Sequence, residues 1–165
     1  MDLSKISIGI DMDGVLADLD TAFYEFTHAN YPGEEEKHSD KSTFFDEFLP
    51  SYVRNDGFFT QGVLHKAPEL VEFLLELDVD LFILTSAGHF YDPISDVIQQ
   101  KKRWIEKNFP ELNLIPFVAT TSGLSKSVFA NPRTILIDDI GCTILSLIYD
   151  EVLNSWCIEI ESETL

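Results

Sequence analysis

The sequence predicts an α/β domain built on a parallel sheet with helices on both faces, which is a three-layer arrangement. Short apolar runs rich in β-branched residues alternate with longer segments whose apolar residues recur at helical spacing. Several of these runs end in polar stretches that contain Asp, Thr or Ser. The order strand, helix, strand implies parallel strands joined by right-handed crossovers. At 165 residues, the chain has the length of one such domain.

The first predicted strand, residues 5–10, leads into Asp11 and Asp13 and then into Gly14. Ligand-binding groups of α/β sheets lie at this carboxyl end of the strands. Because side chains alternate along a strand, both carboxylates would point to the same side. Two like charges so close are unfavourable unless a cation holds them, which makes the pair a candidate site. An ordinary turn is the alternative, since Asp and Gly are common turn residues.

The segment after this strand is predicted to hold a helix and then a long insertion. Apolar residues at helical spacing predict a helix over residues 16–31, and residues 34–61 are predicted to be irregular. A further helix begins near Pro68, since proline suits the first helical turn. The insertion is longer than one crossover requires, so residues 20–66 are predicted to form a small helical cap over the strand ends. The predicted core is the remainder, residues 1–19 and 67–165.

Later apolar runs complete the predicted sheet. The run at 80–84 leads into Thr85 and Ser86, and the run at 134–137 leads into Asp138 and Asp139. Hydroxyl and backbone N–H groups at a strand end suit a phosphoryl oxygen, and carboxylates suit a hard cation. Capping of a turn is the alternative for each pair. The other predicted elements are helices at 93–108 and 141–149, a short strand at 114–120 and an edge strand at 156–160.

Two lysines are candidates to bind phosphate. Lys126 lies in a loop of Ser and Gly between the hydroxyl pair and the acidic pair, and a solvated surface lysine is the alternative. Lys101 falls in an otherwise apolar helical row. That position fits either a lysine at the margin of the core with its amine in solvent, or a helper at a phosphate site.

These motifs come in the order Asp-x-Asp, Thr/Ser, Lys and acidic pair, and in this the sequence resembles the haloacid dehalogenase superfamily. The stretches DMDGVLAD, LTSAG and LIDD are most similar to its 5'(3')-deoxyribonucleotidase branch. The resemblance covers nearly the whole chain and implies a Rossmann-like fold with a cap inserted after the first strand. It also implies a Mg²⁺-dependent phosphatase in which Asp11 attacks phosphorus and Asp13 acts as general acid and then as general base.

For the metal, the resemblance implies that Mg²⁺ is held by the side chain of Asp11, the carbonyl of Asp13 and one residue of the acidic pair. Alignment with the family implies that Asp139 binds the metal directly. Asp138 would then lie outside the direct ligands or alternate with Asp139 as ligand. The residues alone leave the order of these two aspartates open. The donors are all oxygen atoms, which Mg²⁺ prefers.

For the substrate, the resemblance implies that Thr85, Ser86 and Lys126 bind the phosphate group. Lys101 matches a K-x-x-W-x-E-K pattern of the resembled nucleotidases, which keeps its phosphate-binding role open. In that family the cap closes over the nucleoside, so aromatic rings in the cap are candidates to stack on a base. These candidates are Phe44, Phe45, Phe58 and Phe59.

Composition limits the expected partners and location. The net charge of −18 repels phosphate backbones, so duplex nucleic acid is not an expected partner. No apolar run reaches the roughly 20 residues that a membrane span needs, and no signal peptide is visible, so no membrane partner is expected. Cys142 and Cys157 form no framework and predict free thiols in a reducing cytosol. The expected location is cytoplasmic.

Three functions fit the sequence. The first is a Mg²⁺-dependent nucleotidase acting on small (deoxy)ribonucleoside monophosphates. The second is a phosphatase of the same mechanism on another small phosphate ester, such as a sugar phosphate, and the third is a non-catalytic binding module. Intact Asp11, Asp13, Lys126 and Asp139 favour an enzyme. The expected partner is a small phosphate ester, and the oligomeric state, a homodimer included, is left open.

Overall fold

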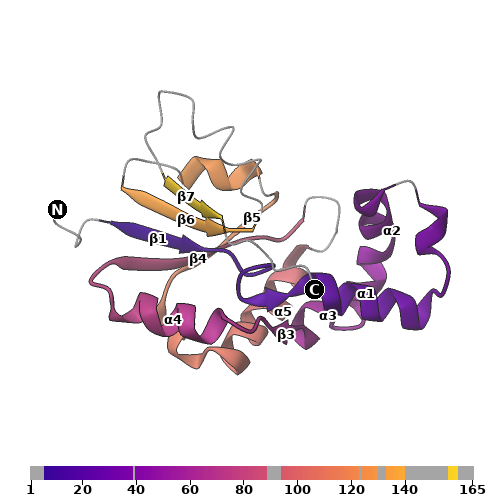
Figure 1. Ribbon diagram of the computed structural model, residues 1–165, viewed down its shortest axis with the longest axis horizontal. Helices are drawn as coiled ribbons and strands as arrows, with labels where there is room; N and C mark the ends of the chain where they lie inside the picture. The colour runs from indigo at the N-terminus through magenta and orange to yellow at the C-terminus, as the bar shows by residue number, and fades with distance from the viewer. Residues whose placement is uncertain are drawn as a thin grey trace.

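A five-stranded parallel sheet forms the centre of the molecule, with strand order β5-β4-β1-β6-β7. The computed structural model describes residues 6–38, 40–88, 94–122, 124–129, 133–139 and 156–159. The predicted α/β fold with a parallel sheet is therefore confirmed (Figure 1). The strands are β1 (Ser7–Ile10), β4 (Asp80–Ser86), β5 (Phe117–Thr120), β6 (Thr134–Asp138) and β7 (Trp156–Glu159).

Strand β1 occupies the middle of the sheet and fixes where the polar strand ends meet. Ile10 lies opposite Ile83 of β4 and Ile137 of β6. The backbone N–H of Asp11 donates to the carbonyl of Ile137 at 2.9 Å, so the pairing continues to the end of β1. The C-terminal ends of these three strands consequently lie at the same edge of the sheet.

Two helices cover one face of the sheet and bury its apolar side chains. They are α4 (Ala67–Glu76) and α5 (Ile94–Asn108), which lie below the strands in Figure 1. Pro68 lies in the first turn of α4, as predicted, where its missing N–H costs nothing. The core between these helices and the sheet includes Ile10, Leu16, Val71, Ile83 and Trp104.

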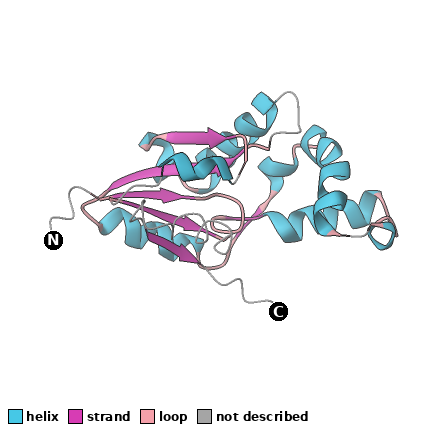
Figure 2. Cartoon of the chain, turned by 90° about the horizontal axis from the view of Figure 1, so that it is seen from above, coloured by secondary structure: helices cyan, strands magenta, loops and turns pink. Residues whose placement is uncertain are grey.

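Three helices form a separate group at one end of the sheet, seen on the right in Figures 1 and 2. They are α1 (Leu19–Asn30), α2 (Lys41–Arg54) and α3 (Gly57–Thr60), with a 3₁₀ turn, η2, at Glu35–Lys37. The antiparallel strands β2 (Ala17–Asp18) and β3 (Gly62–Val63) join this group to the sheet. It lies in the segment for which a cap was predicted, and we call it the cap; its predicted boundaries stay a prediction.

The helix predicted over residues 16–31 begins later than expected, at Leu19. The carboxylate of Asp18 accepts a hydrogen bond from the N–H of Thr21 at 3.1 Å and so caps α1. Leu16, which was counted on the apolar face of the helix, is fully buried in the core under the sheet. The apolar spacing ran across the boundary, although Leu16 packs in the core under the sheet and Phe23 of α1 packs in the apolar cluster of the cap.

The prediction that residues 34–61 are irregular is wrong. Asp40 caps α2 by accepting from the N–H of Thr43 at 2.8 Å, and Phe44, Phe48 and Tyr52 then recur at helical spacing on its buried face. Pro50 lies inside this helix and obscures it in the sequence, because proline removes a helical hydrogen bond. Packing of the aromatic face against α1 and α3 offsets that loss.

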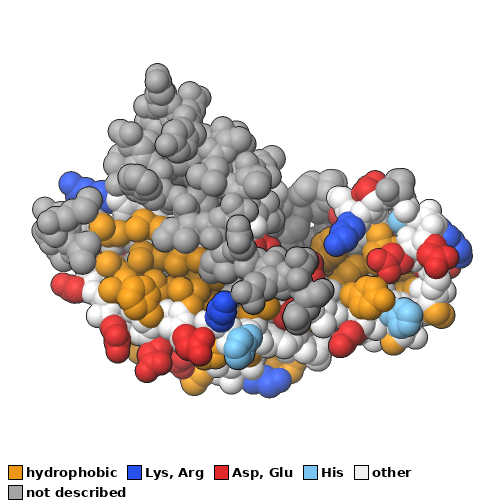
Figure 3. Space-filling view, viewed as in Figure 1, with side chains coloured by type: hydrophobic (Ala, Val, Ile, Leu, Met, Phe, Trp, Pro, Cys, Tyr) orange, Lys and Arg blue, Asp and Glu red, His pale blue; other side chains and the backbone are white. Residues whose placement is uncertain are grey.

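The remaining elements differ from prediction only at their ends. Strand β5 starts at Phe117 because Pro110–Leu114 forms a 3₁₀ turn, η3. The helix predicted at 141–149 lies outside the described residues. Within the described ranges, no helix is both long and apolar enough to cross a membrane. Asp and Glu side chains are spread over the visible surface of the core and the cap (Figure 3), as the charge of −18 requires.

Candidate active site

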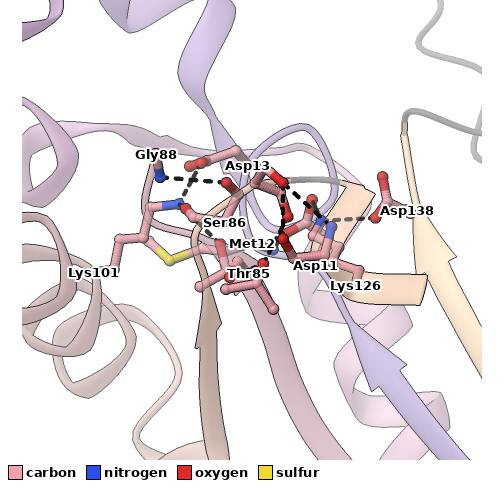
Figure 4. Close-up of polar contacts among 12 residues, drawn as sticks. Asp11, Met12, Asp13, Thr85, Ser86, Gly88, Lys101, Lys126 and Asp138 are labelled. Atoms are coloured by element: carbon pink, nitrogen blue, oxygen red, sulfur yellow. Dashed lines mark hydrogen bonds and ion pairs between the residues drawn. The ribbon is translucent and has the colours of Figure 1, made fainter. Parts of the chain in front are cut away.

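The candidate site is assembled where β1, β4 and β6 end. Asp11 follows β1, Thr85 and Ser86 end β4, and Asp138 ends β6. Parallel neighbours carry their carboxyl ends to one edge, so residues far apart in sequence converge there (Figure 4).

Asp11 is buried and bound on both carboxylate oxygens. Its Oδ1 accepts from the N–H of Met12 at 2.7 Å, and its Oδ2 lies 2.5 Å from Nζ of Lys126. Burial raises the pKa of Asp11 to about 6, although the positive charge of Lys126 counteracts part of the increase. The side chain is thus held rigidly, with its charge balanced by a single lysine.

Lys126 comes from the 3₁₀ turn η4 (Leu124–Phe129) and is 1 % exposed. Its Nζ also lies 2.7 Å from Oδ2 of Asp138, so one ammonium bridges two carboxylates. Burial lowers the pKa of Lys126, but Asp11 and Asp138 outweigh burial and raise it above its usual value. The predicted alternative of a solvated surface lysine is excluded by this burial.

Three carboxylates cluster around this lysine. Oxygens of Asp11, Asp138 and Asp139 all lie within 4.8 Å of one another. Partial burial and the charges of Asp11 and Asp138 raise the pKa of Asp139 to about 7. Lys126 pairs with two of the three, which leaves excess negative charge that a divalent cation would neutralise. The donors fit Mg²⁺, which prefers carboxylate oxygens.

Gly14 allows Asp139 to approach the loop after β1. Its φ of +75° is a left-handed conformation that favours glycine. A Cβ at this position would lie 2.1 Å from Oδ2 of Asp139, too close to be tolerated. Any side chain at position 14 would therefore displace Asp139 from the acidic cluster.

Asp13 faces a different partner from Asp11. Its Oδ2 lies 2.5 Å from Nζ of Lys101, which also donates to Oγ1 of Thr85 at 2.8 Å and to the carbonyl of Ser86 at 2.6 Å (Figure 4). Lys101 is fully buried, so the interpretation of a core-margin lysine with its amine in solvent is wrong. Asp13 does not join the carboxylate cluster through its side chain. A metal contact through its carbonyl stays a prediction.

Thr85 and Ser86 lie between the two lysine-bound aspartates. Thr85 is fully buried, and Ser86 accepts from the N–H of Gly88 at 3.3 Å through its Oγ. The site thus offers two buried ammonium groups, two hydroxyls and the buried carboxylate of Asp11 at one edge of the sheet. A dianionic phosphate group is the ligand that matches such a set.

The four phenylalanines predicted to stack on a base have packing roles, three in the cap and Phe59 against the core. Phe44 is 8 % exposed and Phe58 is 4 % exposed, and both belong to the apolar cluster of the cap. Phe45 packs on Phe23 at 4.7 Å between ring centroids, and Phe59 lies under the guanidinium of Arg103 at 4.1 Å. Contact with a base stays a prediction for all four.

Phe58 also contacts the candidate site. The ammonium of Lys101 lies 4.9 Å from the centroid of the Phe58 ring. The ring is therefore positioned beside the Asp13–Lys101 pair, at the boundary between cap and core.

Two side chains at the same boundary were missed by the sequence analysis. Tyr52 and Gln61 are buried, and their polar side-chain atoms have no hydrogen-bond partner among the described residues. No motif or spacing marks either residue, since burial without a partner depends on tertiary contacts. His89, which follows the Thr85–Ser86 motif in the sequence and could line the site, lies outside the described ranges.

Comparison with known proteins supports the fold at low sequence identity. One solved structure that matches is a hydrolase of the haloacid dehalogenase-like family from Streptococcus pneumoniae. The alignment has a TM-score of 0.50 and 16 % identity, and it covers 82 % of this chain and 77 % of the other. No protein-family model and no curated protein sequence matches the chain. The shared feature is the haloacid dehalogenase-like fold.

Proposed function

We propose that the chain is a Mg²⁺-dependent phosphomonoesterase that hydrolyses small nucleoside monophosphates through an aspartyl-phosphate on Asp11. The observation that carries this proposal is the arrangement of two buried carboxylate–lysine pairs, Asp11–Lys126 and Asp13–Lys101, at one sheet edge. The fold shared with a haloacid dehalogenase-like hydrolase supports it.

In the first step, a carboxylate oxygen of Asp11 attacks phosphorus and the ester P–O bond breaks. Protonated Asp13 gives its proton to the departing alkoxide, which leaves as an alcohol. The Oδ1 of Asp13 has no partner among the described residues and is the oxygen on which that proton can reside. Lys101 holds the other oxygen and so fixes the direction of proton transfer.

In the second step, water attacks phosphorus and the bond between phosphorus and Asp11 breaks. The Asp13 carboxylate takes a proton from that water, which restores both aspartates and releases inorganic phosphate. Lys101 and Lys126 balance the charge of the phosphoryl group throughout, since they are buried and already in place. This local positive charge offsets the repulsion between a phosphate ester and a protein with a net charge of −18.

The Mg²⁺ ion would be held by Asp11, Asp138 and Asp139, because their oxygens cluster within 4.8 Å. Lys126 alone does not neutralise the negative charge of these three carboxylates. When bound, the ion supplies positive charge to the phosphoryl oxygens. Asp139 is the most exposed of the three and can approach a ligand from the open side.

A phosphate-release screen tests this proposal. We expect release of inorganic phosphate from nucleoside monophosphates and from p-nitrophenyl phosphate when Mg²⁺ is present. Higher kcat/KM for a sugar phosphate than for every nucleotide would assign the enzyme to another substrate class. No turnover of any phosphomonoester would contradict an enzymatic function and favour a binding module.

The ring of Phe58 is expected to contribute to nucleotide binding. Stacking a base on an aromatic ring is worth about 1–3 kcal/mol, so Phe58→Leu should raise KM for a nucleoside monophosphate by about five- to a hundredfold. Steady-state kinetics with this substrate and with p-nitrophenyl phosphate would measure the change. The generic ester carries no base and should show a much smaller change.

Phe44→Leu is the matched control, since Phe44 packs in the same cluster against Phe23 and Phe48. Its loss of buried ring area is similar, so its effect on stability should be comparable. Equal changes in KM for both variants on both substrates would mean that Phe58 serves packing alone.

A further inference from the structure

Tyr52 and Gln61 meet at the junction between cap and core. Tyr52 lies on α2 and is 1 % exposed, and its ring packs against Phe58 at 5.4 Å between centroids. Gln61 follows α3 directly before strand β3 and is 4 % exposed. Through the ring of Phe58, Tyr52 is a neighbour of the Asp13–Lys101 pair.

Their polar atoms stand out within the described part of the chain. The buried side-chain atoms without a hydrogen-bond partner there are Oη of Tyr52, Nε2 and Oε1 of Gln61, and Oδ1 of Asp13. Buried polar groups are nearly always paired in native proteins, and an unpaired one costs free energy. Four such atoms in three neighbouring residues indicate a place where a ligand supplies the missing partners.

The pKa of Tyr52 reflects both its burial and its polar neighbours at this junction. Burial raises the pKa of Tyr52, the nearby carboxamide of Gln61 counteracts the increase, and the charges of Asp13 and Asp18 add to it. Gln61 is therefore near the phenol without completing a well-aligned hydrogen bond. The carboxylate of Asp18 caps α1, whereas Asp13 keeps one oxygen, Oδ1, without a hydrogen-bond partner among the described residues.

The ring of Tyr52 and the backbone of Gln61 are held in place by their surroundings. A Cβ at position 57 would lie 2.5 Å from the ring of Tyr52, so glycine at this position lets the phenol lie against the start of α3. The carbonyl of Gln61 accepts from Nε1 of Trp104 at 2.9 Å, which ties its backbone to α5. The phenol is thus fixed by packing, and the carboxamide extends from a fixed point of the backbone.

We propose that the Tyr52 hydroxyl and the Gln61 carboxamide bind a sugar hydroxyl of the leaving group. This hydroxyl lies beside Asp13, which protonates the leaving oxygen. This rests on the proposed phosphomonoesterase function. It narrows the substrates to phosphate esters whose alcohol part carries a further hydroxyl group. Among nucleotides, it selects those whose sugar carries the hydroxyl that Tyr52 and Gln61 bind.

The chemistry of the pair favours a hydroxyl as its ligand. A carboxamide offers both donor and acceptor atoms, and a phenol can donate and accept. A sugar hydroxyl also donates and accepts, so it can satisfy both side chains at once. An analogue that lacks this hydroxyl would leave buried polar atoms unpaired, and such sites discriminate strongly against it.

The test compares one base with three sugars: uridine, 2′-deoxyuridine and 3′-deoxyuridine 5′-monophosphates. For the wild type, we expect kcat/KM to fall at least about tenfold when the bound hydroxyl is missing. Tyr52→Phe and Gln61→Met should each reduce that ratio to about threefold or less. Because the readout is a ratio between substrates, a general loss of active protein does not change it.

Tyr31→Phe is the matched control in the same cap. The Tyr31 hydroxyl is satisfied by Oγ of Ser51 at 2.7 Å, so its removal should lower the melting temperature and leave the ratio unchanged. Tyr52→Phe removes an unpaired hydroxyl and should not lower the melting temperature. If Tyr52→Phe fails to fold, Gln61→Met carries the test alone.

Two results would overturn the inference while leaving the proposed function intact. One is a wild-type enzyme that hydrolyses all three nucleotides with equal kcat/KM. The other is discrimination that persists unchanged in the folded variants. Failure of the proposed function is distinct, since it would appear as no phosphate release from any ester, p-nitrophenyl phosphate included.

Discussion

Asp11→Asn is expected to reduce phosphate release by about 10⁴-fold or more, because it removes the carboxylate that attacks phosphorus. Asparagine keeps an oxygen to accept from the N–H of Met12, and Lys126 keeps its pair with Asp138. The folded structure should therefore persist, with a melting temperature close to that of the wild type. Single-turnover and steady-state assays with p-nitrophenyl phosphate would measure the loss.

The exposed Asp46 on α2 provides the matched control for this variant. Asp46→Asn makes the same change of charge and shape away from the strand ends, and it should leave kcat unchanged. An Asp11→Asn enzyme that retains activity within tenfold of the wild type would contradict the covalent mechanism. The proposed function would then require another nucleophile at this edge.

Removal of divalent metal is expected to abolish activity, and addition of Mg²⁺ should restore it. Asp11, Asp138 and Asp139 place three carboxylates within 4.8 Å, and Lys126 neutralises only part of their charge. A cation that binds the folded state relieves this repulsion, so Mg²⁺ should also raise the melting temperature in a concentration-dependent way. Assays in EDTA with Mg²⁺ added back, and thermal melts without substrate, would measure both effects.

Asp139→Asn separates the metal effect from general stabilisation by salt. This variant should lose most of the rise in melting temperature caused by Mg²⁺, whereas Asp46→Asn should retain it. Full activity in the presence of chelator would show that the reaction proceeds without the ion. An equal rise in melting temperature for both variants would place the ion elsewhere.

The strand ends that form the site could be predicted from the sequence for a definite physical reason. Apolar, β-branched runs define β1, β4 and β6, and each is followed at once by residues with polar side chains. Parallel strands carry their carboxyl ends to one edge, so order along the chain is enough to bring Asp11, Thr85 and Asp138 together. No knowledge of side-chain packing was needed for that step.

Helix α2 shows where local patterns ceased to be sufficient. Its cap at Asp40 and its buried face were present in the sequence, but Pro50 opposes a helix locally. Aromatic packing with α1 and α3 decides the balance, and that packing exists only after the cap has assembled. The same packing buries Phe44, which the sequence alone could not distinguish from a ring exposed to ligand.

The alternation of apolar runs and polar motifs along the sequence was enough to predict the fold class and the candidate residues at the strand ends. The direction of the Lys101 side chain depends on the tertiary structure, because its partner Asp13 lies 88 positions away along the chain. The unpaired polar atoms of Tyr52 and Gln61 depend on the tertiary structure in the same way. A polar atom left unpaired in the interior is defined by everything that surrounds it, and no window of sequence contains those surroundings.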